Sequence, residues 1–214
     1  MKSTTVSFGK PGVGKGTRLS KFMKGREKDY TIVSVGNMLR AARNSGSDLG
    51  LKAASYMDSG ALVPDEIINA VVIEGIKNAK THVITDGFPR TVNQARAMLE
   101  AGIIPTVVIE LQAPNEVILS RAHDRIVCEK CGEAYTLNDY KPPKEAGICD
   151  KCGGKLIRRK DDEEATVMRR LEVYENETYP VLSVLEEAGV EIFVLDTTAS
   201  DIDEQFALIM EKYI

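Results

Sequence analysis

Short runs of β-branched and apolar residues alternate with longer segments whose apolar residues recur at helical spacing. The five strand-like runs cover residues 4–8, 31–34, 82–86, 106–111 and 190–195. One helical pattern follows residue 17, and others cover residues 38–43, 49–57, 65–77, 91–101, 115–125, 163–187 and 202–213. Strands that alternate with helices in this way usually pair as a parallel sheet. The pattern therefore predicts an α/β fold with a central parallel sheet flanked by helices.

The alternation breaks between residues 127 and 160, where cysteine, glycine and proline cluster and long apolar periodicity is lost. Helical periodicity resumes near Asp161. A chain of 214 residues is long enough for one substantial core that carries a smaller insertion. We therefore expect this segment to form an inserted domain.

The first strand-like run leads into the glycine-rich stretch GKPGVGKGT. Gly9, Gly14 and Lys15 follow the spacing of a phosphate-binding loop. The hydroxyl residue, Thr17, comes one position later than usual, after Gly16. Glycines let backbone N–H groups turn toward a polyphosphate, the lysine reaches the outer phosphates, and the next helix directs its positive end at them. The stretch predicts a nucleotide site, and the alternative is a glycine-rich turn without a ligand.

Composition narrows the classes of function. The net charge of -4 provides no overall basic field, which disfavours duplex nucleic acid as a partner. The chain has no N-terminal apolar run of signal-peptide length and no apolar stretch of the roughly 18 residues that cross a membrane. These features predict a soluble cytoplasmic protein that binds neither nucleic acid nor membrane.

Two Cys-x-x-Cys pairs, separated by seventeen residues, lie in the inserted segment. The four cysteines are Cys128, Cys131, Cys149 and Cys152. Each pair can offer two thiolates to one metal, and four thiolates complete a tetrahedron around zinc. We therefore expect one structural zinc ion per chain, without an open position for catalysis. Disulfides and iron in the same four-sulfur site are the alternatives.

An acidic residue and several arginines complete the candidate chemistry. Asp86 ends a strand-like run, which places its carboxylate at the ligand side of a parallel sheet, where it can hold a magnesium-bound water network. Arginines occur at Arg40, Arg90, Arg121, Arg125, Arg158, Arg159, Arg169 and Arg170. A single arginine is more often a solvated surface charge. Together they suit phosphoryl transfer, which needs positive charge spread around the transferred group.

The sequence resembles the adenylate kinases of the long form with a zinc-binding lid. The matching motifs are GKPGVGKGT at 9–17, VGNMLR at 35–40, LVPDE at 62–66, DGFPRTVNQ at 86–94, the four cysteines, and RKDDEEATVMRRL at 159–171. The resemblance implies a P-loop nucleoside monophosphate kinase core formed by residues 1–30, 74–125 and 161–214. It also implies a helical domain at residues 31–73 that covers the monophosphate, and a zinc-ribbon-like lid at residues 126–160.

The resemblance also assigns residues to two nucleotide sites. The ATP site comprises Gly12, Gly14, Lys15, Gly16, Thr17, Arg121 and Arg125, with Arg121 stacked on the donor base. The AMP site comprises Val35, Arg40, Val63, Gly87, Arg90, Gln94, Arg159 and Arg170, with Gln94 reading adenine. Catalysis is assigned to Lys15, Asp86, Arg90, Arg125, Arg159 and Arg170. Asp161 and Asp162 are expected to position the arginines.

Three positions depart from the family pattern. Val35 replaces the usual threonine near the acceptor base, and Asn37 replaces an aspartate expected near the magnesium-bound water. Lys10 replaces a small or apolar residue and adds a positive charge to the loop. We expect these departures to alter nucleotide affinity or magnesium dependence without abolishing transfer.

The resemblance implies reversible transfer of the terminal phosphoryl group from Mg-ATP to AMP, giving two ADP, by a monomeric enzyme of nucleotide homeostasis. The expected partners are therefore ATP, AMP and ADP, with Zn²⁺ and Mg²⁺ as cofactors. One alternative is a related kinase that uses GTP as donor or UMP or CMP as acceptor. The other is a nucleotide-regulated module in which the cysteine-rich segment binds nucleic acid or protein.

Overall fold

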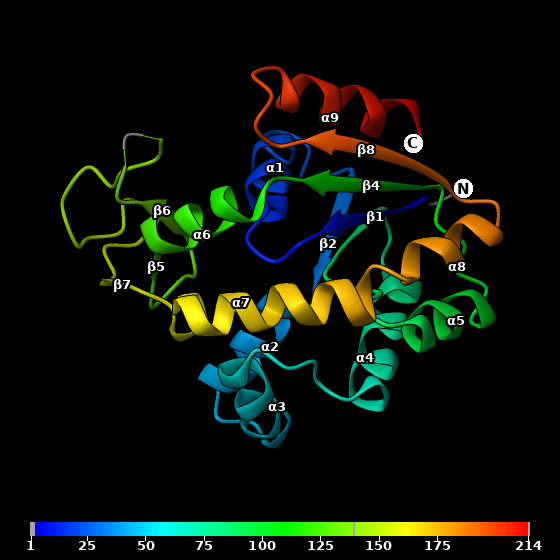
Figure 1. Ribbon diagram of the computed structural model, residues 1–214, viewed down its shortest axis with the longest axis horizontal. Coiled ribbons are helices and arrows are strands. Elements are labelled where there is room, and N and C mark those ends of the chain that lie inside the picture. Colours follow the sequence, from blue (N-terminus) through cyan, green and yellow to red (C-terminus); the bar gives the residue numbers. More distant parts are fainter. Residues whose placement is uncertain (1–2, 139, 214) are drawn as a thin grey trace.

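A five-stranded parallel sheet forms the centre of the protein. The computed structural model describes residues 3–138 and 140–213. The strands are β1 (Thr4–Gly9), β2 (Tyr30–Ser34), β3 (His82–Asp86), β4 (Val107–Gln112) and β8 (Glu191–Asp196). They pair in the order β2-β3-β1-β4-β8, with every pairing parallel (Figure 1). The predicted α/β fold and its five strand-like runs are confirmed.

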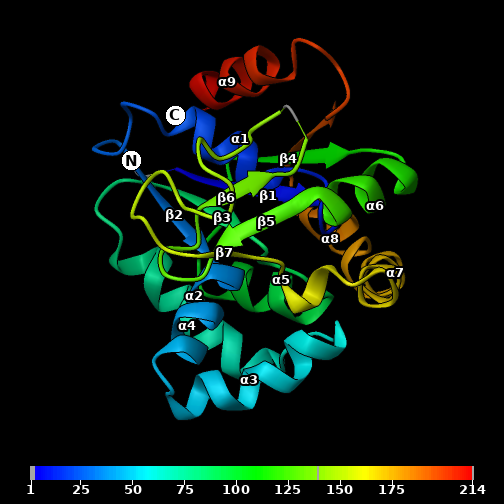
Figure 2. The ribbon, with the colours of Figure 1, turned by 90° about the vertical axis from the view of Figure 1, so that its left-hand side faces the viewer.

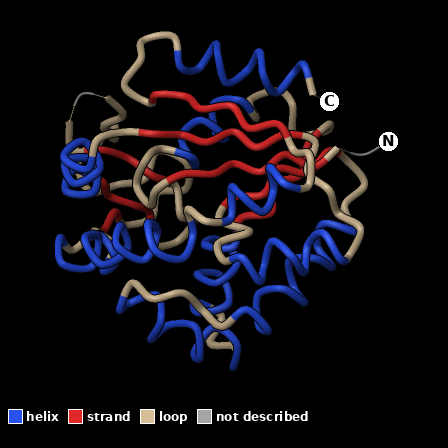
Figure 3. Tube along the Cα trace, turned by 45° about the vertical axis from the view of Figure 1, so that its right-hand side comes forward, coloured by secondary structure: helices blue, strands red, loops and turns tan. Residues whose placement is uncertain are grey.

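Helices cover both faces of the sheet (Figure 3). They are α1 (Lys15–Phe22), α2 (Val35–Asn44), α3 (Asp48–Ser59), α4 (Asp65–Asn78), α5 (Val92–Glu100), α6 (Asn115–Asp124), α7 (Glu164–Val173), α8 (Val181–Glu187) and α9 (Ile202–Lys212). Because side chains alternate along a strand, Val108 packs in one buried cluster while Val107 and Ile109 pack in the other. Each such side chain contributes roughly 1.5–3 kcal/mol when fully buried.

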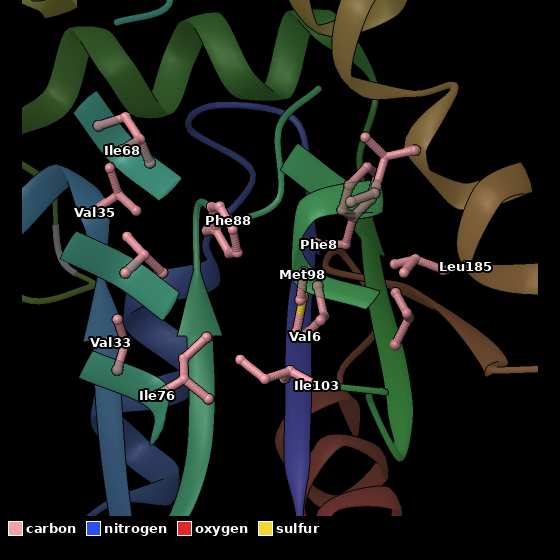
Figure 4. Close-up of a cluster of buried hydrophobic side chains, with 14 of the residues drawn as sticks. Val6, Phe8, Val33, Val35, Ile68, Ile76, Phe88, Met98, Ile103 and Leu185 are labelled. Carbon is pink, nitrogen blue, oxygen red and sulfur yellow. The ribbon is translucent and has the colours of Figure 1, made fainter. Parts of the chain in front are cut away.

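The cluster that contains Val108 joins the sheet to α2, α4, α5 and α8. Figure 4 shows side chains of this cluster, among them Val6 and Phe8 of β1 and Leu185 of α8. The second cluster contains residues of α1, α6, α7 and α9. Each face of the sheet is therefore fixed by its own packed layer, which holds the carboxyl ends of the strands in place.

The helical pattern predicted over residues 163–187 is divided in the structure. α7 runs into a π-helical turn, Tyr174–Thr178, in which the Tyr179 N–H donates to the carbonyl of Tyr174 at 2.8 Å. Pro180 follows and cannot donate a backbone hydrogen bond, so α8 begins as a separate helix. The wide turn also buries the Tyr174 ring against Phe8, at 5.8 Å between centroids.

A helical hairpin of α2 and α3 lies below the sheet in Figure 1. Gly50 allows the two helices to touch, since a Cβ atom there would lie 2.1 Å from the carbonyl carbon of Ala42. The Ser47 hydroxyl caps α3 by accepting a hydrogen bond from the Gly50 N–H at 3.2 Å. The predicted helical domain at residues 31–73 begins later in the structure. Residues 31–34 belong to β2, which pairs with β3 in the central sheet, and the helical part begins with α2.

The cysteine-rich segment forms a small antiparallel sheet of its own. It consists of β5 (Arg125–Cys128), β6 (Ala134–Thr136) and β7 (Leu156–Ile157), in the order β6-β5-β7. Figure 2 views the protein from the side on which this sheet projects. A short 3₁₀ turn, Lys160–Asp162, leads from it back to α7. Among the described residues, no helix combines the length and apolar character needed to cross a membrane.

Candidate functional site

The glycine-rich loop connects β1 to α1 at the carboxyl edge of the sheet. Gly9, Gly12 and Gly14 have positive φ values of 128°, 82° and 112°. A Cβ atom on Gly9 would also lie 2.3 Å from the Leu111 carbonyl oxygen. Only glycine fits both conditions, so the loop turns tightly and α1 begins directly at Lys15. Gly16 and Thr17 form the first turn of that helix.

The Lys15 ammonium folds back over the loop. Its Nζ donates to the carbonyl oxygens of Gly9 at 2.6 Å and Lys10 at 2.9 Å. Burial lowers the pKa of Lys15 to about 8, although the nearby Asp86 carboxylate opposes the shift. The Lys10 side chain instead binds Glu175 at 2.8 Å and Asn115 at 3.0 Å. The extra loop charge noted in the sequence is therefore paired with a carboxylate.

Asp86 ends β3 beside the loop, in register with Ser7 of β1. The Ser34 hydroxyl, at the end of β2, donates to the Asp86 carboxylate at 3.0 Å. Three parallel strands thus bring their carboxyl ends to one place, which is where open α/β sheets bind ligands. The carboxylate fits a magnesium-bound water network, because its oxygens are ligands of the kind that Mg²⁺ prefers.

A cluster of half-buried cations lies above this edge. Burial is the main cause, and the charge of Arg170 the next largest, of a lowered pKa of about 10 for Arg90. Burial, followed by the charges of Arg125 and Arg40, lowers the pKa of Arg159 to about 10. These arginines come from different segments of the chain, so only the fold brings them together. Their carboxylate partners do not fully offset the loss of solvation, and the cluster is suited to bind an anion.

Polar partners hold several of the arginine side chains. Arg170 Nη1 donates to the Asp161 carboxylate at 2.8 Å, and Arg125 Nε donates to Asp162 at 2.8 Å. Burial raises the pKa of Asp161, but the charges of Arg170 and the other arginines outweigh this effect and lower it overall. Arg40 Nη2 donates to the amide oxygen of the neighbouring Asn37 at 2.7 Å. The two aspartates therefore orient arginines, as the sequence predicts.

One pocket contains most of the residues predicted for the acceptor nucleotide. Val35, Arg40, Val63, Gly87, Arg90, Gln94 and Arg170 line it together with Lys15 and Asp161. Its walls are apolar at Val35 and Val63, and Gln94 is only 2% exposed. The Arg90 backbone N–H donates to the Gln94 side-chain oxygen at 2.7 Å. The pocket therefore has an apolar part with one fixed polar group and a strongly cationic part, as a nucleotide requires.

Arg121 lies on the other side of the loop. Its guanidinium donates to the carbonyl of Val13 at 2.7 Å, and to the hydroxyl and carbonyl of Thr197 at 2.7 and 3.0 Å. Thr197 follows β8 and is 3% exposed. Sequence reasoning missed this threonine because it belongs to no recognised motif. The arrangement places Arg121 and the segment after β8 next to the phosphate loop.

The four cysteines come together beside the small antiparallel sheet, with Cys128 at the end of β5 and the other three outside its strands. All their Sγ atoms lie within 4.8 Å of one another, with Cys128 and Cys152 3.5 Å apart and Cys131 and Cys149 3.6 Å apart. Four sulfur atoms bound to zinc at about 2.3 Å would be separated by roughly 3.8 Å. Tyr135 is buried beside them, with its hydroxyl 3.5 Å from the Cys149 sulfur. The residues therefore fit a four-sulfur zinc site.

Comparison with known proteins agrees with this architecture. The family model described as "Adenylate kinase" matches residues 7–190. The adenylate kinase of Carboxydothermus hydrogenoformans is 44% identical over 208 residues, which cover 94% of this chain and 95% of the relative. The adenylate kinase of Syntrophomonas wolfei is 41% identical and covers 97% of each chain. That of Bacillus licheniformis is 42% identical and covers 86% of each. The chain therefore belongs to the adenylate kinase family.

Proposed function

We propose that this protein catalyses the reversible transfer of the terminal phosphoryl group of Mg-ATP to AMP, giving two molecules of ADP. One observation carries the proposal: half-buried cations from separate segments converge between a phosphate loop and a pocket shaped for a second nucleotide. Membership in the adenylate kinase family supports the same reaction.

The donor nucleotide would occupy the phosphate loop. The N–H groups of Gly12, Gly14, Gly16 and Thr17 would surround its phosphates, while Lys15 would exchange its two carbonyl partners for phosphate oxygens. Arg121, held beside the loop by Thr197, would stack on the donor base. Magnesium would accompany the donor, neutralise phosphate charge, and be held through water by Asp86.

The acceptor would enter the pocket between the sheet and α2. Its base would lie against Val35 and Val63 and bind Gln94, and its phosphate would bind Arg40 and Arg90. Gly87 leaves room for the Arg90 side chain to reach the phosphate, because a Cβ atom at position 87 would lie 2.6 Å from the Arg90 guanidinium. The two phosphate groups would then face each other across the arginine cluster.

The reaction requires little covalent participation by the protein. An oxygen of the AMP phosphate attacks the terminal phosphorus of ATP in line, and the bond from that phosphorus to the bridging oxygen of ADP breaks. The attacking oxygen is already anionic, so no general base is needed. Lys15, Arg125, Arg159 and Arg170 would stabilise the charge on the transferred group, and closure of the cysteine-rich sheet would exclude water.

The division into a core, a monophosphate domain predicted at 31–73 and a 126–160 lid is part of this proposal. Because residues 31–34 lie in the central sheet, we place the start of the monophosphate domain at α2. Zinc bound by the four cysteines would stabilise the lid and leave no open coordination position for the reaction. We infer a monomer that acts in the cytoplasm, in keeping with the family resemblance.

The direct test is ADP formation by the purified protein from ATP and AMP, with and without magnesium. We expect magnesium-dependent formation of two ADP per ATP consumed. Parallel assays with GTP as donor and with UMP and CMP as acceptors test the alternative base preferences. Salt-sensitive binding to oligonucleotides, in a protein that forms no ADP when AMP is added, would instead favour the binding-module alternative.

Lys15 makes donor binding dependent on pH. Near pH 8 about half of the Lys15 side chains are neutral, because burial lowers their pKa to about 8. Bound phosphates favour the charged form, so Lys15 should take up as much as about half a proton at pH 8 and almost none at pH 6.5. The ligand is Mg-ATP, because bound magnesium keeps the terminal phosphate ionised over this range. Titration calorimetry of ATP binding in buffers of different ionisation enthalpy measures this uptake. Lys15→Met should abolish it and Lys24→Met, on the exposed surface, should retain it; equal uptake in both variants would refute the assignment.

A further inference from the structure

Asp65 connects the acceptor pocket to the start of α4. Its carboxylate accepts hydrogen bonds from the Thr91 hydroxyl at 2.7 Å and from Gln94 Nε2 at 2.7 Å. The other end of the Gln94 side chain, Oε1, accepts from the Arg90 backbone N–H at 2.7 Å. These contacts join the start of α4 to the start of α5, and the two helices are neighbours (Figure 1). We propose that Asp65 is a specificity-determining residue that fixes the Gln94 carboxamide in the orientation that selects a 6-aminopurine.

The chemistry of the two partners permits only one orientation of the carboxamide. A carboxylate oxygen accepts hydrogen bonds, and a backbone N–H donates them. If the Gln94 side chain turned over, its oxygen would face the oxygen of Asp65, and its NH₂ group would face the N–H of Arg90. Two favourable contacts would become two repulsive ones. Because Gln94 is 2% exposed, water could not readily compensate the unpaired groups.

The Thr91 hydroxyl makes the arrangement more rigid. It donates to Asp65, and its oxygen accepts a hydrogen bond from the Gln94 backbone N–H at 3.0 Å, which caps α5. The backbone and the side chain of Gln94 are therefore tied to the same small network. One oxygen of the Asp65 carboxylate binds Thr91 and the other binds Gln94, so the two hydrogen bonds do not compete with each other.

A fixed carboxamide distinguishes two classes of purine. After its internal bonds, Gln94 retains one N–H and one oxygen lone pair for a ligand. Adenine complements them, since its N1 accepts and its 6-amino group donates. A 6-oxopurine has the opposite pattern, with N1–H as donor and O6 as acceptor, and would need the carboxamide turned over. The inference rests on the proposed function, in which the purine of the acceptor monophosphate binds Gln94.

The variant Asp65→Asn tests the proposal. An asparagine can direct either its oxygen or its NH₂ group at Gln94, so one of the two constraints on the carboxamide disappears. We expect the ratio of kcat/KM for AMP to that for inosine monophosphate, a 6-oxopurine nucleotide, to fall roughly tenfold. The change should appear mainly in KM for the acceptors, while KM for ATP stays near its wild-type value.

Glu66→Gln is the matched control, because it removes the same charge from the same helical turn at an exposed position. Its selectivity ratio should equal that of the wild type. A merely structural role for Asp65 would lower the use of both acceptors together and leave the ratio unchanged. A folded, active Asp65→Asn protein whose ratio lies within about twofold of wild type would overturn the proposal. Failure of the wild-type protein to form ADP from ATP and AMP would instead refute the underlying function.

Discussion

Replacing Arg90 with alanine is expected to reduce the rate of phosphoryl transfer about a thousandfold. Removal of one preorganised group that stabilises transition-state charge in a buried site costs about 10²–10³ in kcat. Arg90 is half-buried near Arg40 and Arg170 and is proposed to bind the acceptor phosphate directly. We therefore expect a loss at the upper end of this range, together with a higher KM for AMP. Steady-state ADP formation at varied AMP concentration measures both quantities.

The fold should tolerate this change. Burial lowers the pKa of Arg90 from its usual value to about 10, which means that the folded state disfavours the charged side chain at neutral pH. Alanine removes that charge, so the unfolding temperature should stay the same or rise. The contact to Gln94 comes from the Arg90 backbone N–H and survives the substitution. Activity should therefore fall without a loss of stability, which distinguishes a functional loss from misfolding.

Two further variants sharpen the Arg90 experiment. Arg90→Lys keeps the positive charge but loses the planar pair of donors, so its rate should lie between those of the wild type and the alanine variant. Arg96→Ala removes an exposed arginine from the following helix and should leave turnover unchanged. Near-normal turnover of Arg90→Ala at limiting AMP would contradict the assignment of the acceptor site.

Local patterns allowed the phosphate loop and the five strands to be predicted. The loop depends on closely spaced glycines whose positive φ values allow a tight turn, and this spacing can be read directly from the chain. The close contact of Gly9 with Leu111 joins two strands and could not be read in this way. Alternation of strands and helices similarly predicts a parallel sheet. The strand order β2-β3-β1-β4-β8 could not be predicted from the sequence, because the spacing of apolar residues indicates which residues are buried but not which strands are neighbours.

Contacts between residues far apart in the chain could not be predicted from the sequence. Thr197 binds Arg121 across 76 positions, and Asp65 binds Gln94 across 29 positions. Nothing in the local sequence indicates these contacts. Asp65, for example, has the local pattern of any acidic residue in the first turn of a helix. The π-helical turn after α7 was missed for a related reason, because the inward placement of Tyr174 depends on packing against Phe8.

Removing a metal ion from the four cysteines is expected to unfold the lid and leave the central sheet intact. The three lid strands contain only four, three and two residues. Apart from the cysteines, their core consists of Ile126, Tyr135 and Leu156. A core of this size cannot offset the loss of chain entropy, so the metal would supply most of the folding free energy. Hydrogen exchange should show loss of protection in residues 126–160 and retained protection in β1 and β4.

With the lid unfolded, the remaining core should unfold at a temperature about 10 °C lower, as expected for a loss of roughly 3–5 kcal/mol in a chain of this length. Phosphoryl transfer should fall as well, because Arg125 begins β5 and Arg159 follows β7, so both depend on the lid for their position. Calorimetry before and after treatment with a zinc-selective chelator, with magnesium supplied in excess, measures the first effect. Restored zinc should reverse both changes.

Cys149→Ser should reproduce the effect of chelation, since it removes a buried thiol of the proposed metal site. Lys130→Ala is the matched control: Lys130 lies between Cys128 and Cys131 but is exposed, so its loss should change neither metal content nor unfolding temperature. If chelation removes one equivalent of metal while lid protection and the unfolding temperature stay the same, the metal does not stabilise the lid. If transfer stops while the lid remains folded, the metal takes part in the reaction, and the assignment of a closed four-sulfur structural site is wrong.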